Sequence, residues 1–182
     1  MSYKLPYTLP IDGQEKEIYC DFRAVIDICK ALNDPLVPDD EKGIILLNNL
    51  YVDDYKEFAD RDEAVKQAIW FIDWGKEYKE PENSPKLMDW EQDENMIISA
   101  VDKNIKGAET CLDLPFLHWW TFLNKFAERG ECQLSFVTDI RDKLAKGKNL
   151  EKYEKEILRE NRDIIILKDK NNEDFENELW GD

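Results

Sequence analysis

The sequence predicts a mainly α-helical fold, a bundle of about six to seven helices with a short β-hairpin at the N-terminus. Apolar residues recur three and four positions apart through most of the chain, which is the spacing of one helix face. Alternation with a two-residue period, typical of strands, is confined to residues 5–20. The 182 residues include seven glycines and seven prolines, too few for a typical β-sandwich.

The first half is predicted as a hairpin followed by three helices. Asp12-Gly13, a pair that favours positive φ, marks the hairpin turn. Asp21 is a predicted N-cap for the first helix, which ends at Asn33-Asp34-Pro35. The proline and acids of Pro38–Glu41 open the second helix, and the third begins near Asp60. The predicted inward faces are Phe22, Val25, Ile26, Cys29 and Leu32; Ile44, Ile45, Leu47, Leu50 and Tyr51; and Ala64, Val65, Ala68, Ile69, Phe71 and Ile72.

The second half is predicted to hold four further helices. Residues 76–86 hold two prolines, charges and almost nothing apolar, so they are the expected flexible connection, and the domain would subdivide at residues 76–88. The helices are expected from Asp89 to Ile105, from Phe116 to about Arg129, from Ser135 to Leu144, and from about Asn149 to Leu167. Residues 1–168 then form a single helical domain. Residues 169–182 form an acidic tail with little apolar surface, which is expected to be disordered.

The net charge of −16 restricts the classes of partner. Such a negative field repels phosphate backbones and anionic lipid surfaces, so neither nucleic acid nor a membrane is an expected partner. Two interpretations of the charge remain. It keeps the protein soluble by mutual repulsion, or its carboxylates imitate the phosphates of DNA. The four cysteines lack metal-site spacing, and no apolar run of about twenty residues is present. A reducing cytoplasm is therefore the expected location.

Catalytic chemistry is not predicted. The one histidine, His118, lies in the bulky sequence Leu117-His118-Trp119-Trp120, where a structural role is the favoured interpretation. The chain has no Gly-rich phosphate loop and no His-Glu-x-x-His helix, and its acids show no calcium-loop spacing. We therefore expect no enzyme activity, no cofactor and no metal.

Two tryptophan positions are candidate contacts for a protein partner. Trp119 and Trp120 are adjacent, so on a helix they point about 100° apart. One is expected in the core with Phe122 and Phe126, and the other either seals a neighbouring helix or stays exposed; the core is the favoured interpretation. Trp180, an isolated aromatic residue in the acidic tail, is a candidate docking anchor.

Several motifs, in order along the chain, resemble the bacteriophage Gp-fifteen family. The resemblance spans about Tyr7 to Ile165, and its most specific part is His-Trp-Trp-x-Phe followed by Ile-Arg-x-Lys. The motifs are Ile11-Asp12-Gly13, Asp21-Phe22-Arg23, Asp34-Pro35, Glu41-Lys42, Asp89-Trp90-Glu91-Gln92-Asp93, Ile97-Ile98, Asp113-Leu114, His118-Trp119-Trp120-Thr121-Phe122 and Ile140-Arg141-Asp142-Lys143.

The resemblance implies a protein of the tail module of long-tailed phages and prophages of Gram-positive bacteria, encoded near the tape-measure protein. It implies a tail assembly chaperone that coats the tape measure in the host cytoplasm, and a homo-oligomer is a further partner expectation. The partner-binding residues are expected to be Trp119, Trp120, Phe126, Ile140, Arg141, Lys143 and Trp180. Two alternatives are a minor structural component retained in the virion and a DNA-mimic inhibitor of a host defence nuclease.

Overall fold

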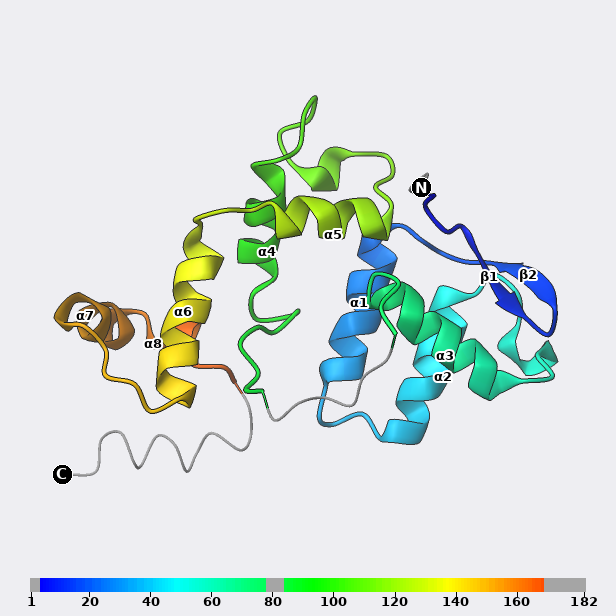
Figure 1. The fold of residues 1–182 in the computed structure, drawn as a ribbon, viewed down its shortest axis with the longest axis horizontal. Helices are drawn as coiled ribbons and strands as arrows, with labels where there is room; N and C mark the ends of the chain where they lie inside the picture. Colours follow the sequence, from blue (N-terminus) through cyan, green and yellow to red (C-terminus); the bar gives the residue numbers. More distant parts are fainter. Residues whose placement is uncertain (1–3, 78–83, 169–182) are drawn as a thin grey trace.

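The structure is a computed structural model that describes residues 4–77 and 84–168. It confirms a mainly helical chain with a short antiparallel hairpin at its N-terminus (Figure 1). Its strands and α-helices are β1 Thr8–Ile11, β2 Gln14–Glu17, α1 Phe22–Asn33, α2 Asp39–Leu50, α3 Arg61–Ile72, α4 Glu94–Asp102, α5 Trp119–Ala127, α6 Gln133–Ala145, α7 Lys152–Glu160 and α8 Arg162–Ile165. Two 3-10 turns, η1 Tyr55–Glu57 and η2 Cys111–Asp113, lie between them.

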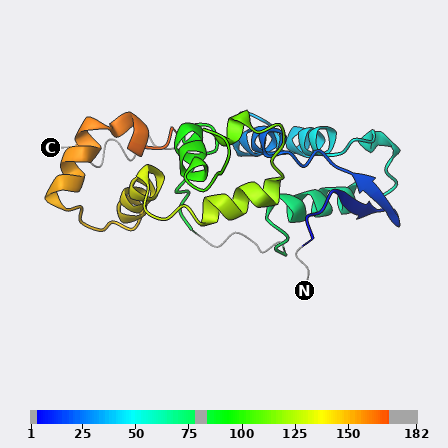
Figure 2. The same ribbon diagram turned by 90° about the horizontal axis from the view of Figure 1, so that it is seen from above.

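The helices are arranged in two layers along an elongated molecule. Seen from above, α1, α2 and α4 form one layer, while α3, α5 and α6 form the other (Figure 2). The hairpin lies at one end and α7 at the other. Two packed layers allow each helix to bury its apolar stripe against a neighbour.

The hairpin forms as predicted and is tied to the start of α3. Asp12 and Gly13 adopt φ values of 53° and 72°, the positive values that a tight two-residue turn requires. The Asp12 carboxylate accepts hydrogen bonds from the backbone N–H groups of Ala59 (2.8 Å) and Asp60 (3.0 Å). Leu9 and Ile11 are fully buried. A two-stranded ribbon is marginal by itself, so these contacts stabilise it.

The predicted helix starts of the first half are confirmed at two caps. The Asp21 side chain accepts from Arg23 N at the start of α1, and that of Asp60 accepts from Glu63 N at the start of α3. Each carboxylate satisfies a backbone donor that has no partner within the helix.

Boundaries in the second half differ from the predictions. Helix α4 begins at Glu94 rather than at Asp89, because the Asp89 carboxylate caps the preceding turn through Glu91 N and Gln92 N. It ends at Asp102, before Ile105. Helix α5 begins at Trp119 because His118 is its N-cap.

The single helix predicted from Asn149 to Leu167 is wrong. Asn161 has φ −127° and ψ 39°, and it divides the segment into α7 and α8. After α8 the chain becomes extended, with ψ 123° at Ile166. The carbonyl groups of residues 164 and 165 point at the Arg141 guanidinium, so this end of the chain bonds to a side chain rather than to a continued helix.

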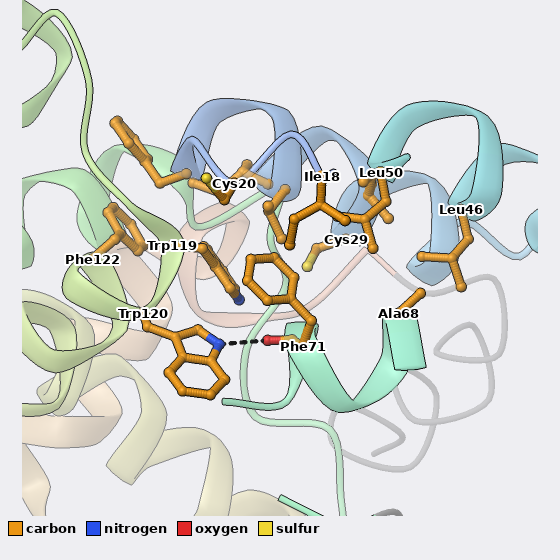
Figure 3. Packing of buried hydrophobic residues seen from close by; sticks show 14 of the residues in the cluster. Ile18, Cys20, Cys29, Leu46, Leu50, Ala68, Phe71, Trp119, Trp120 and Phe122 are labelled. Atoms are coloured by element: carbon orange, nitrogen blue, oxygen red, sulfur yellow. Dashed lines mark hydrogen bonds between the residues drawn. The ribbon is translucent and has the colours of Figure 1, made fainter. Parts of the chain in front are cut away.

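The buried apolar residues form two clusters. The larger draws on both sides of the predicted division at residues 76–88, since Phe22 of α1 stacks on Phe122 of α5 at 4.7 Å between ring centroids. Figure 3 shows part of this cluster, with Phe71 of α3 beside Trp119 and Trp120 of α5. The smaller is made by Val137, Ile140, Leu150, Leu158 and Ile165, and Met96 packs against both clusters. The tail at residues 169–182 lies outside the described residues, and so does most of the predicted connection, residues 78–83.

Candidate functional site

Both tryptophans of the predicted contact are in the core. Trp119 is 1% exposed and donates its indole N–H to the carbonyl of Ile72 at 2.9 Å. Trp120 is 8% exposed and donates to the carbonyl of Phe71 at 2.8 Å (Figure 3). The two indoles thus join the start of α5 to the carboxyl end of α3. The favoured interpretation, a core position, agrees with this geometry. It holds for both tryptophans.

Glycine is needed where the chain leaves α3. Gly75 has φ +74°, and a Cβ atom there would lie 2.9 Å from Cη2 of Trp120. The left-handed backbone and the close indole both disfavour any larger residue. The chain can therefore turn away from α3 without displacing Trp120.

Arg141 of α6 and Asp93, the residue before α4, form a buried ion pair within the second half of the chain. The guanidinium makes a two-pronged contact with the carboxylate, at 2.6 Å from Nη1 and 2.9 Å from Nη2. Its remaining donors bond to the carbonyls of Leu87, Ile164 and Ile165 at 2.7–2.9 Å. All five N–H groups are thereby satisfied, so Arg141 fixes three chain segments around α6.

The other predicted contact residues do not join one surface. Ile140 is fully buried, and Phe126 is half-buried beneath the Arg129 guanidinium, 4.4 Å from the ring centroid. Lys143 pairs with the buried carboxylate of Glu154 at 2.5 Å. Trp180 lies outside the described residues. Trp119, Trp120, Ile140 and Arg141 therefore have little surface to offer a partner in this conformation.

Exposed apolar side chains lie elsewhere: two of them are beside His118, and the third, Leu112, is four residues before Phe116. Tyr7, Leu112 and Phe116 are 53%, 50% and 47% exposed, and we call them the Tyr7–Phe116 surface. The rings of Tyr7 and Phe116 both lie edge-on to the His118 imidazole, at 5.1 and 6.5 Å between centroids. Tyr7 and Leu112 lie outside the predicted helix stripes, whereas Phe116 was predicted as the first residue of a helix. Phe116 is exposed because α5 begins only at Trp119.

The loop that presents this surface is held by Asp21 and Arg23. The Arg23 guanidinium donates to the carbonyls of Leu112, Leu114 and Pro115 at 3.1–3.3 Å, and to the Asp21 carboxylate at 2.7 and 2.9 Å. Burial alone would raise the pKa of Asp21, but hydrogen bonds from Arg23 and Leu117 outweigh it and hold this pKa below its ordinary value. The loop that carries Leu112 and Phe116 is therefore held against the start of α1.

His118 is a structural residue with both ring nitrogens engaged. Nδ1 accepts the backbone N–H of Trp120 at 3.0 Å, which leaves the proton on Nε2 to donate to the carbonyl of Pro6 at 2.8 Å. Burial lowers the pKa of His118, while the bond to Pro6 acts in the opposite sense. A neutral imidazole that caps α5 and anchors residue 6 has no free nitrogen to act as a base.

The buried state of His118 predicts acid sensitivity. The unfolded chain binds a proton near the ordinary pKa of 6.5 and the folded chain only at lower pH, so stability is full above about pH 6.5 and falls below it. The loss approaches about 1.4 kcal/mol per pH unit between the two pKa values. We expect the urea concentration at the unfolding midpoint of the native chain to be lower at about pH 5.5 than at about pH 7.5. The decrease should be smaller in His118→Asn, which keeps a capping oxygen. If the urea midpoint fell equally with pH in the two proteins, His118 would not be the group responsible for the acid sensitivity.

Cys29 and Cys111 are buried thiols. Burial raises the pKa of Cys29 and of Cys111 to about 12. Residues 4–77 and 84–168 contain no group of three or more metal-ligating side chains. No helix in the same residues is long and apolar enough to span a bilayer.

Comparison with known proteins gives a family match over most of the chain. A family model described as "Bacteriophage Gp15 protein" matches residues 1–167. No curated protein and no solved structure matches the chain. The matched span covers every described helix and strand and excludes the whole of the acidic tail at residues 169–182.

Proposed function

The chain belongs to the bacteriophage Gp15 family, and we propose that it is a tail assembly chaperone that binds the tape-measure protein. The observation that supports this role is the Tyr7–Phe116 surface, three half-exposed apolar side chains of which Leu112 and Phe116 stand on the loop that Arg23 holds. Exposed apolar groups that gather on one surface are typical of protein-binding sites. Because the chain carries a charge of −16, a complex formed through this surface would also gain charge and resist aggregation.

The tape measure is the proposed partner because a long amphipathic helix needs a protein that binds its apolar face. An apolar helix face left in water aggregates, and the Tyr7–Phe116 surface offers aromatic area at low cost in side-chain entropy. This proposal replaces Trp119 and Trp120 as direct contacts, since their indoles are engaged with α3. Phe116 and Tyr7 take that role.

Co-expression with the tape-measure protein of the same phage tests the proposal. We expect the tape measure to stay in the supernatant and to co-elute with this chain. Phe116→Ala combined with Tyr7→Ala should weaken binding by roughly 30-fold or more, the range of a lost interface hot spot, without loss of folding. Leu36→Ala is the matched control, because Leu36 is 67% exposed on the α1–α2 connection.

Three results would count against the chaperone. A tape measure that precipitates despite co-expression would refute capture. Equal binding by the double variant and the Leu36→Ala control would refute the Tyr7–Phe116 surface as the contact. Recovery of the chain in purified virions would favour the minor structural component instead.

A further inference from the structure

A groove between α6 and α7 has an apolar floor. It encloses about 570 Å³ at the end of the molecule opposite the hairpin, where α6 and α7 meet (Figure 1). Leu144, Leu150 and Leu158 line it, and the last two are members of the smaller core cluster. The floor is therefore a fixed part of the fold.

The rim of this groove is basic, in contrast to the chain as a whole. Lys148, Lys152, Lys155 and Arg159 line it together with one acid, Glu156. All four cationic residues are exposed, and none has an ion pair within the described residues, whereas the neighbouring Lys143 and Lys146 are both paired. Four unpaired cations around an apolar floor form a site for a segment that is both acidic and apolar.

The same chain carries a segment of that composition. Residues 169–182 contain six acids and one lysine, and among the acids stand three large apolar residues, Phe175, Leu179 and Trp180. The family match ends at residue 167, just before this segment begins. We propose that the acidic tail segment of this chain docks in its own α6–α7 groove, with its apolar side chains on the leucines and its carboxylates on the basic rim.

The length of the tail permits this contact within one molecule. Arg159 is nine residues before Lys168, so at a maximum of about 3.6 Å per residue the two Cα atoms are within about 32 Å. Trp180 is twelve residues beyond Lys168, a reach of about 43 Å on the same measure. A tail held at Lys168 therefore reaches the groove without help from a second copy. Linkage through so short a segment also gives the tail a high effective concentration at the groove.

Site-specific photo-crosslinking in the full-length chain tests the proposal. Trp180 is replaced by the photoreactive residue p-benzoylphenylalanine, which keeps an aromatic side chain at this position. After irradiation we expect a product of monomer mass, with the cross-link mapped by mass spectrometry to residues 144–159. The yield should fall at least fivefold in a Lys155→Glu/Arg159→Glu variant, and also in 1 M salt, where the Debye length is about 3 Å.

The control variant is Lys66→Glu/Lys106→Glu, which changes the net charge equally at two exposed sites outside the groove. It should retain the cross-link. Circular dichroism of both variants checks folding, which exposed charge reversals should leave unchanged. Cross-links outside residues 144–159, a product of dimer mass alone, or equal losses in the two variants would each overturn the proposal.

Discussion

Replacing Arg141 by alanine is expected to lower the free energy of unfolding by about 3–5 kcal/mol, the cost of breaking a buried ion pair from one side. The substitution leaves the Asp93 carboxylate fully buried without its cation, and it removes a donor from the carbonyls of Leu87, Ile164 and Ile165. Since the free energy of unfolding of a domain is typically about 5–15 kcal/mol, the variant should be only marginally stable. Urea denaturation followed by far-UV circular dichroism measures the loss.

Lys146→Ala is the matched control for this experiment. Lys146 is the C-cap of the same helix, half-exposed, and pairs with Asp142 one turn away at 2.6 Å. Such a surface pair is worth at most about 1 kcal/mol. A double variant, Arg141→Met/Asp93→Leu, should be more stable than Arg141→Ala, because it leaves no charge unpaired. An Arg141→Ala chain that unfolds at the same urea concentration as Lys146→Ala would contradict the structural role.

The sequence predicted those parts of the fold that local physical chemistry determines. The Asp12-Gly13 turn and the caps at Asp21 and Asp60 each depend on a few neighbouring residues, and each is present. Long-range contacts set the remainder. Arg141 was interpreted as a surface cation because its partner, Asp93, is 48 residues away in the sequence. The break at Asn161 was missed for the same reason, since the carbonyl acceptors beyond it face Arg141.

The family motifs also proved to be structural in this chain. The Asp89–Asp93 and Ile140–Lys143 motifs meet at the buried ion pair, and the His118–Phe122 motif meets Asp21-Phe22-Arg23 at the start of α5. The backbone N–H of Trp119 donates to the Cys20 carbonyl at 2.8 Å, and that of Phe22 donates to the Leu117 carbonyl at 3.0 Å. Motifs of this kind identify a fold, and they are a poor guide to a contact surface. The candidate surface therefore had to come from exposure.

Trp119→Ala is expected to destabilise the fold about as strongly as Arg141→Ala, by about 3–5 kcal/mol. The indole of Trp119 stacks on Phe122 at 5.5 Å between centroids and lies 5.6 Å from Trp90, so its removal leaves a cavity in the larger cluster. It also leaves the Ile72 carbonyl without its donor. Trp119→Phe keeps most of the ring volume and should cost clearly less. Thermal unfolding of the three chains measures the difference.

Trp119→Ala and Phe116→Ala together separate folding from binding, although the two residues are only three positions apart. Phe116 is half-exposed, so its truncation should leave the melting temperature nearly unchanged while it weakens tape-measure capture. Trp119→Ala should lower capture only in proportion to the fraction of chain that is unfolded. If Trp119→Ala has the same melting temperature as the native chain and still fails to capture the tape measure, then the indole is itself a contact. In that case α5 must move away from α3 when the partner binds.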